Sequence, residues 1–359
     1  MDNVSEFWYI WVDTGGTFTD CLAQSPTGEI SRVKVLSTGR LRATVSMVLA
    51  QDQLVISCST TLPDNFLVGA NLIASTTGIQ VGEILQHDIR SGKCQLRRAM
   101  DHQLCSGELL ELDFGMEAPV LAARLITQTP PERPLPRAAF HLATTKSTNA
   151  LLERKGDPTA FVVTKGFKDL LKIGDQRRPD LFALNIDQAD PLHDLVFEFD
   201  ERMDALGDVL KPFDDEAFHQ LSDALLQAGF TTVAIAFLHA VQNSEHERKA
   251  REILQGKGIR HISCSSELAP FVKILPRAET SVVNAYLTPL MERYLDGVES
   301  ALSGGDFRIM TSAGGFVSRR DYRAKDSLFS GPAGGVVGAS TIAHQCGEGR
   351  TIAFDMGGT

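Results

Sequence analysis

The sequence lacks the features that mark membrane, secreted and zinc-binding proteins. No apolar run in its 359 residues approaches the roughly 18 needed to span a bilayer. The opening MDNVSEFWYIWVD has no basic region followed by an apolar one, so no signal peptide is expected. The six cysteines form no CxxC pair, and the nine histidines form no HxxxH or HExxH pattern. These absences predict a cytoplasmic protein with free thiols and no membrane partner.

Positive charge is also scarce. The chain has 35 Lys and Arg residues against 45 Asp and Glu residues, which gives a formal net charge of −10. Nucleic acids and anionic membranes are usually bound by basic surfaces, so neither is an expected partner. A phosphate-bearing ligand must then be held by local groups. The length and the 43% of hydrophobic residues indicate a globular chain of about two to three domains.

Three stretches of different texture follow one another. Residues 7–36 have the pattern of a three-stranded meander with glycine-containing turns. Residues 45–138 alternate in short strands with little helical periodicity and end in the proline-rich TPPERPLPR. From residue 139 apolar strands alternate with helical segments, which predicts a mixed or parallel sheet covered by helices.

One motif occurs twice, each time behind an apolar strand. Asp13-Thr14-Gly15-Gly16-Thr17 follows the first strand, and Asp355-Met356-Gly357-Gly358-Thr359 follows the last. Glycines permit positive φ and let backbone N–H groups approach an anion, and the aspartate can hold Mg²⁺ through water. A single glycine turn after a strand is common, but the pair predicts a duplicated phosphate clamp.

The paired motif is similar to the phosphate hairpins of actin-like (ribonuclease H-like) ATPases, in which two related lobes each offer a hairpin to the nucleotide. The intervening sequence resembles the hydantoinase A and 5-oxoprolinase family, and RRPDLFAL with the β-rich insertion favours 5-oxoprolinase-like members. Ala143 stands where the family usually has glycine. The segments that carry the resemblance, in order, are TTKSTNALLERKG, VVTKGFKDLLKIGDQRRPDLFAL, AETSVVNAYLTPLMERYL, TSAGGFVS and SGPAGGVVGA.

The resemblance implies an α/β fold of actin-like lobes. Residues 1–44 and 139–262 would form the N-terminal lobe, 45–138 an inserted β-rich module, and 263–359 the start of a second lobe that is truncated inside its phosphate motif. The family continues beyond this point. A hydantoinase B-type subunit or fused C-terminal region would complete the chemistry, and we expect an oligomer.

The activity implied by the family is ATP-dependent hydrolysis of a cyclic amide, 5-oxoproline or a hydantoin-type lactam. Phosphorylation of the amide oxygen would let water attack the ring, while the protein positions the groups and neutralises charge. In this scheme Asp13 and Asp355 organise Mg²⁺ and water. The phosphates of ATP would be held by Thr14, Gly15, Gly16, Thr17, Gly357, Gly358 and Thr359. A small-molecule kinase of the same superfold and a non-catalytic interaction remnant are the alternatives.

A glycine-rich segment, Ser330-Gly331-Pro332-Ala333-Gly334-Gly335, precedes the helical pattern VVGASTIAHQ. A loop that feeds a helix N-terminus can hold an anion through free N–H groups and the helix dipole. The alternative is a tight turn that allows close packing. Because the family places this loop near the ATP cleft, Gly331, Gly334 and Gly335 are expected on the phosphate side.

Three further groups of polar residues are candidates for the substrate side. They are Thr145, Thr148 and Asn149 in TTKSTN, Arg177 in QRRPD, and Ser312 and Gly314 in TSAGG. The first group has an alternative as a helix cap, the second as a surface ion pair, and the third as a plain turn. An arginine fork suits a carboxylate or a phosphate, and the family implies that the first group faces the cleft.

The segment NSEHERKAREIL places Glu245, His246 and Glu247 at the start of a charged helix. Acidic side chains in a first turn complement the helix dipole. We therefore interpret this segment as a solvated helix start rather than as an acid–base or metal site.

Overall fold

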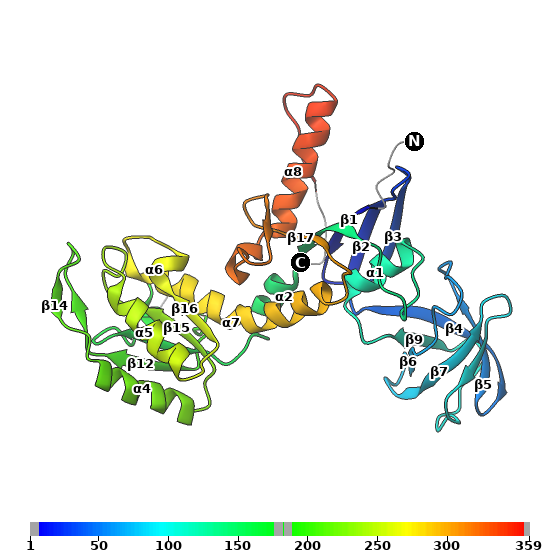
Figure 1. Cartoon of the computed structure of the whole chain (residues 1–359), viewed down its shortest axis with the longest axis horizontal. Helices are drawn as coiled ribbons and strands as arrows, with labels where there is room; N and C mark the ends of the chain where they lie inside the picture. Colours follow the sequence, from blue (N-terminus) through cyan, green and yellow to red (C-terminus); the bar gives the residue numbers. More distant parts are fainter. Residues whose placement is uncertain (1–6, 176–181, 183–188, 355–359) are drawn as a thin grey trace. The chain divides into compact units, whose positions relative to one another are not determined.

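The computed structural model describes residues 7–175, 182 and 189–354 (Figure 1). The chain divides into two compact units, of which the first comprises Met1–Asn149, Arg293–Tyr322 and Asp326–Thr359, and the second Ala150–Glu292 and Arg323–Lys325. The boundaries of these units differ from the boundaries expected from the sequence. The reason is that strands near residues 140 and 307 join one sheet with the first strand.

The first unit contains a six-stranded sheet of order β18-β17-β10-β1-β2-β3. Its strands are β1 (Trp8–Thr14), β2 (Phe18–Gln24), β3 (Ile30–Leu36), β10 (Ala138–Thr144), β17 (Gly305–Met310) and β18 (Phe316–Ser318). β1, β10 and β17 are parallel, and β1, β2 and β3 form the antiparallel meander that the sequence predicts. Ile10 and Val12 are buried on one face, whereas Trp11 and Asp13 lie on the other.

Helix α1 (Ala118–Ile126) packs against β1, β2 and β3. This helix was not predicted from the sequence, because all its residues from Ala118 to Leu125 are buried. A helix that is covered on every side lacks the apolar stripe that reveals helical periodicity. The β-rich stretch therefore ends before residue 118 rather than at 138.

Six strands between residues 40 and 113 close into a barrel of order β4-β5-β8-β7-β6-β9, so this part of the chain is β-rich as expected. The strands are β4 (Arg40–Ala50), β5 (Gln53–Cys58), β6 (Asn71–Ala74), β7 (Gln80–Asp88), β8 (Lys93–Leu96) and β9 (Leu109–Asp113). Alternate side chains such as Leu54, Ile56, Leu72 and Leu110 are buried. The alternation fills the barrel interior and leaves the outer positions polar or partly exposed.

The second unit has a four-stranded parallel sheet of order β12-β11-β15-β16. Its strands are β11 (Ala160–Thr164), β12 (Leu195–Phe199), β15 (Thr232–Ala236) and β16 (His261–Cys264), beside a small hairpin of β13 (Arg202–Met203) and β14 (Val209–Lys211). β11 and β15 are buried at every position, so both faces are covered. The sequence prediction of a buried β/α sheet is confirmed here.

Helices cover both faces of this sheet. Phe218 and Leu225 of α4 (Asp215–Gln227) and Leu254 of α5 (Glu245–Gly256) pack on the face of Val162 and Ile235. The opposite face, which carries Phe161 and Val163, packs against the α7 residues Ala278, Val282 and Ala285. The remaining helices are α2 (Lys146–Leu152), α3 (Leu170–Ile173), α6 (Ser265–Leu268), α7 (Ile274–Glu299), η1 (Ala324–Ser327) and α8 (Ser330–Gln345). Among the described residues no helix is both long and apolar enough to span a membrane.

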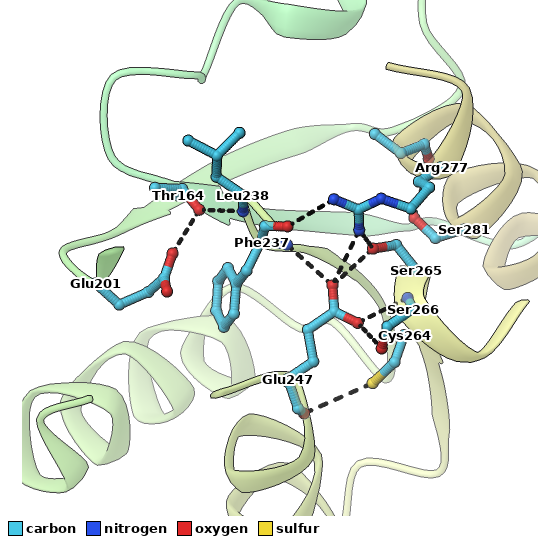
Figure 2. Close-up of polar contacts among 11 residues, drawn as sticks. Thr164, Glu201, Phe237, Leu238, Glu247, Cys264, Ser265, Ser266, Arg277 and Ser281 are labelled. Atoms are coloured by element: carbon cyan, nitrogen blue, oxygen red, sulfur yellow. Dashed lines mark hydrogen bonds and ion pairs between the residues drawn. The ribbon is translucent and has the colours of Figure 1, made fainter. Parts of the chain in front are cut away.

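The start of α5 is buried, contrary to the interpretation of NSEHERKAREIL as a solvated helix start. His246 is 3% exposed and Glu247 is 1% exposed. Figure 2 shows Glu247 surrounded by donors from the ends of β15 and β16. Its carboxylate accepts hydrogen bonds from Phe237 N at 2.9 Å, Ser265 Oγ at 2.6 Å, and Ser266 N and Oγ at 2.9 and 2.6 Å.

Arg277 of α7 completes this network. It is 0% exposed, it donates from Nη2 to Phe237 O at 2.9 Å, and its Nη1 lies 3.9 Å from Glu247 Oε1 (Figure 2). Burial lowers the pKa of Arg277, and Glu247 opposes that effect. A buried carboxylate that is fully hydrogen-bonded and paired is stable where an isolated one would not be. The network therefore ties α5, α6 and α7 to the sheet.

Candidate functional site

The first glycine motif forms a tight hairpin between β1 and β2. Gly15 N donates to Phe18 O at 3.0 Å, and Ser37 Oγ donates to Gly15 O at 2.8 Å. A Cβ added to Gly15 would lie 3.1 Å from Phe18 O, although the φ of Gly15 is outside the left-handed range. At Gly15 the hairpin therefore does not use the positive φ that glycine permits. A side chain there would require Phe18 to shift slightly, because the backbone passes close to its carbonyl oxygen.

Two later segments meet at the ends of the neighbouring strands β1 and β10. Thr145 N donates to Thr14 O at 2.9 Å, and Ser330 Oγ donates to Thr144 O at 3.0 Å. Thr148 Oγ1 donates to Leu328 O at 2.6 Å. The polar groups of the TTKSTN segment thus link β1, α2 and the segment that leads into α8. The large number of hydroxyl groups in this segment is explained partly by these structural hydrogen bonds.

A buried tyrosine on α7, which carries no sequence motif, also contacts the end of β1. Tyr294 OH donates to Thr14 Oγ1 at 3.3 Å, and Lys146 Nζ lies 4.2 Å from the centre of the Tyr294 ring. Lys146 also pairs with Glu117 at 3.3 Å. Burial raises the pKa of Tyr294 well above its usual range, so the phenol stays protonated as a donor to Thr14.

A cavity of about 700 Å³ lies between the outer face of β1, β2 and β3 and the first turns of α8. Asp13, Gly331, Gly334 and Gly335 line it, so the structure brings the first motif and the glycine-rich segment together. The expectation of a loop before the helix is wrong, because α8 begins at Ser330 and includes all three glycines. Their spacing puts the glycines on one helix face, called here the glycine face of α8.

The start of α8 changes what the glycines can contribute. Ala333 N already donates to Phe329 O at 3.0 Å, and Gly334 and Gly335 lie deeper in the helix, where N–H groups bond to carbonyls four residues earlier. Only the first residues, Ser330 and Gly331, keep free N–H groups. The glycine face therefore supplies space, and the helix N-terminus supplies the donors.

Charged residues from neighbouring strands line the other side of the cavity. Asp13 is the register partner of Asp20, and Arg32 and Lys34 stand on β3. Lys34 Nζ pairs with Asp20 Oδ2 at 2.7 Å on the exposed side. Two cations and two carboxylates in one cavity suit a phosphate with a bound divalent cation.

Aromatic side chains form the third side. Trp11 stacks on His141 with ring centres 6.0 Å apart, and His141 meets Phe316 edge-on at 4.9 Å. Burial lowers the pKa of His141, so the imidazole is neutral at neutral pH. Burial raises the pKa of Cys21, in the same cavity, to about 12, which excludes this thiol as a nucleophile at neutral pH.

The remaining expected site residues have different surroundings. Asn149 Oδ1 is buried and no hydrogen-bond partner is recorded for it among the described residues. Ser312 Oγ donates to Asp326 O at 2.6 Å and accepts from Phe329 N at 3.0 Å. Gly314 has φ +79° and lies against Val337 of α8, so the turn requires glycine whether or not a ligand binds.

Several expected site residues lie outside the described residues. They are Arg177, Asp355, Gly357, Gly358 and Thr359. Within the described parts, no three His, Cys, Asp or Glu side chains are grouped so that they could hold a metal ion by themselves. A Mg²⁺ ion at Asp13 would therefore be held chiefly by water and phosphate oxygens, which is its usual manner of binding.

Comparison with known proteins decides the family. The family described as "Hydantoinase/oxoprolinase N-terminal region" matches residues 9–119 and 122–258, and "Hydantoinase/oxoprolinase" matches residues 277–359. This chain belongs to the hydantoinase/oxoprolinase family. The resemblance seen in the motifs is thereby confirmed.

The curated relatives include several 5-oxoprolinases. The chain is 36% identical over 284 residues to 5-oxoprolinase from Saccharomyces cerevisiae, which covers 68% of this chain and 22% of that protein. It is 38% identical over 276 residues to 5-oxoprolinase 1 from Arabidopsis thaliana, with the same coverage of 68% and 22%. The chain therefore spans about a fifth of the length of these relatives.

Two solved structures share the fold. The crystal structure of ATP-dependent caprolactamase from Pseudomonas jessenii matches with a TM-score of 0.53 and 28% identity, over 62% of this chain and 34% of that one. A nucleotide-free acetone carboxylase matches with a TM-score of 0.57 and 20% identity, over 95% of this chain and 41% of that one. At that identity the second match shows the fold alone, which is a mixed α/β fold.

Proposed function

We propose that this chain is the N-terminal, ATP-binding part of an enzyme that hydrolyses a cyclic amide, 5-oxoproline or a hydantoin-type lactam. The observation that carries the proposal is the cavity where Asp13, the glycine face of α8, Arg32 and Lys34 meet. A chain of net charge −10 needs such a local site to hold a triphosphate. The relatives named 5-oxoprolinase and ATP-dependent caprolactamase support the substrate class.

The fold we propose is an actin-like first lobe. Its support is the order β3-β2-β1-β10-β17, an antiparallel meander followed by parallel strands, with a glycine hairpin after the first strand. In this proposal a second lobe starts within residues 263–359 and continues in the part of the longer relatives that this chain does not match. Asp355, Gly357, Gly358 and Thr359 would form its phosphate hairpin.

For the phosphates, the proposed contacts come from the N–H groups at the start of α8 and from the hairpin residues Thr14 to Thr17. Arg32 and Lys34 would neutralise charge on the phosphate oxygens. The glycine face would let the phosphates approach the helix without meeting a Cβ. Asp13 would orient the water ligands of Mg²⁺, which supplies charge neutralisation at the phosphoryl group when it is bound.

On the substrate side, Asn149 has the best support. Its buried Oδ1 is an acceptor that a lactam N–H could fill, since an unpaired buried acceptor costs free energy until it is satisfied. Thr145 and Thr148 hold the start of α2, which carries Asn149. Arg177, Ser312 and Gly314 remain proposed contacts.

The chemistry starts from an unreactive amide. Its oxygen attacks the γ-phosphorus, the bond from that phosphorus to the β–γ bridging oxygen breaks, and ADP leaves. Water then adds to the activated carbon. The bond between that carbon and the ring nitrogen breaks as the nitrogen takes up a proton from the added water, which opens the ring to an acyl phosphate with a free amine. A second water releases phosphate and the carboxylate. The chain contributes position, charge neutralisation and exclusion of water from the phosphates.

Partners belong to the same proposal. The relative named caprolactamase subunit alpha, 30% identical over 229 residues, supports an enzyme in which a second polypeptide, or a fused hydantoinase B-type region, completes the reaction. We propose that the active form is such an oligomer.

The test is phosphate release by the chain joined to its downstream region, with MgATP and a panel of cyclic amides. Asp13→Ala should reduce release stimulated by the amide by at least about a hundredfold, while Asp101→Ala, an exposed barrel position, should not change it. A phosphorylated product without ring opening would establish the kinase alternative instead. Absence of ATP turnover in the extended chain would leave the non-catalytic interaction remnant.

A further inference from the structure

A second cavity, of about 460 Å³, lies in the barrel and is separate from the one that contains Asp13. It is formed where β5 ends and where the turn between β7 and β8 folds over that end. Its lining is rich in hydroxyl groups, contributed by Ser57, Ser59, Thr60, Thr61 and Ser91, with Arg90 among them. No carboxylate is among the lining residues, all of which the structure describes.

The turn that carries Arg90 is fixed in place by its own backbone. Gly92 has φ +69°, and a Cβ there would lie 2.3 Å from Ile56 O, so only glycine lets the turn pack against β5. Ile56 N donates to Gly92 O at 2.9 Å, and Gly92 N donates to Asp88 O at 2.8 Å. The backbone of the turn is therefore fixed against β5, and Arg90 and the hydroxyl groups of residues 57–61 line one cavity.

The guanidinium of Arg90 is not paired with the acid nearest to it in the turn. Asp88, the nearest acid in the turn, accepts from Ser91 Oγ at 2.6 Å and from Arg90 N at 3.0 Å, and these bonds, that of Ser91 first, lower its pKa. The carboxylate of Asp88 thus accepts its hydrogen bonds from within the turn. Within the described part of the chain no ion pair is recorded for the Arg90 guanidinium. His87, also in the lining, has a buried Nδ1 without a recorded partner.

We propose that this cavity, called here the barrel cavity, binds a small organic oxyanion, a carboxylate or a phosphate ester. The guanidinium of Arg90 would hold the anionic group, because its planar fork matches both kinds of oxyanion. The hydroxyl groups of Ser59, Thr60 and Thr61 would donate to the remaining oxygens. The inference does not rest on the proposed function, since no residue of the barrel cavity lines the cavity that contains Asp13.

The experiment is an NMR titration of the complete chain, with backbone amide shifts as the readout. The probes are inorganic phosphate and acetate, added separately, so that the two arms distinguish the phosphate source from the carboxylate source. Arg32→Ala is the background variant, because it removes a cation that lines the other cavity. We expect saturable shifts at residues 57–61 and 90–92 with at least one probe.

Arg90→Ala should weaken that binding about tenfold or more, since a charge-assisted hydrogen bond is lost. Arg98→Ala, an exposed barrel arginine outside the cavity, is the matched control and should bind like the background variant. Unchanged amide shifts away from the turn would confirm that the Arg90 variant is folded. The proposal is overturned if neither probe shifts these amides, or if Arg90→Ala and Arg98→Ala bind equally.

Discussion

Gly334 gives the candidate site space rather than a hydrogen-bond donor. A Cβ at this position would lie 3.6 Å from Met310 Cε, an ordinary contact, so Gly334→Ala should fold. Alanine should stabilise α8 by about 0.5–1 kcal/mol relative to glycine. At the same time the methyl group should crowd the phosphates and raise the KM for ATP in the extended chain about tenfold.

The control for this prediction lies on the same helix. Gly338 does not line the cavity, and a Cβ there would meet nothing within 4 Å. Gly338→Ala should therefore raise the melting temperature in the same way and leave the KM unchanged. Equal KM values for both variants would contradict the assignment of the glycine face to the phosphate side.

His141 gives the unfolding free energy a dependence on pH. Because burial lowers its pKa in the folded chain, the unfolded chain binds more protons below about pH 6.5. Stability should therefore fall as the pH drops through that range and be fully present above it. His141→Gln should flatten the dependence between about pH 5 and 7, measured by urea unfolding. An unchanged slope would show that His141 titrates alike in both states.

At the scale of the structural element, the packing of α5 depends on the buried side chain of Glu247. Glu247→Ala should destabilise the second unit by about 3–5 kcal/mol, because it leaves Arg277 buried without its charge partner. The comparison is Glu252→Ala on the same helix, whose pair with Arg248 is more than half exposed and whose loss should cost less than about 0.5 kcal/mol. Chemical denaturation followed by circular dichroism measures both.

The same helix shows where sequence reasoning ends. In NSEHERKAREIL the buried Glu247 cannot be distinguished from its exposed neighbours, because its donors Ser265 and Arg277 arrive from segments later in the chain. Other elements were predictable, because each follows a regular pattern of apolar residues along the sequence. They are the meander, the buried strands β11 and β15, and α4. The start of α8 was not predictable, because its glycines have low helix propensity.

Only the part of the candidate site that carries a sequence motif was predictable. Asp13 and the glycines at 331, 334 and 335 carry a motif, and the structure brings them into one cavity. Arg32, Lys34 and His141 carry none. They reach the cavity only through the order of strands and the alternation of side chains on one face, which a single sequence does not reveal.

At the scale of the whole molecule, each compact unit buries apolar side chains of its own, such as Ile10 and Leu54 in the first and Phe161 and Phe218 in the second. We expect two unfolding transitions in calorimetry, since units with their own cores can unfold independently. Glu247→Ala should lower only the transition of the second unit, and hydrogen exchange should locate the faster-exchanging amides there. A single transition that moves as a whole would show that the units are one cooperative body.

Helix α8 carries four glycines in 16 residues and buries only Ser330 in full. Relative to alanine these glycines disfavour the helix by about 1 kcal/mol each. The stability of α8 must then depend on contacts made by its first turns. The helix extends about 24 Å over its 16 residues. An anion bound at the first turn of α8 would complement the helix dipole, so binding should raise the helix content of residues 330–345.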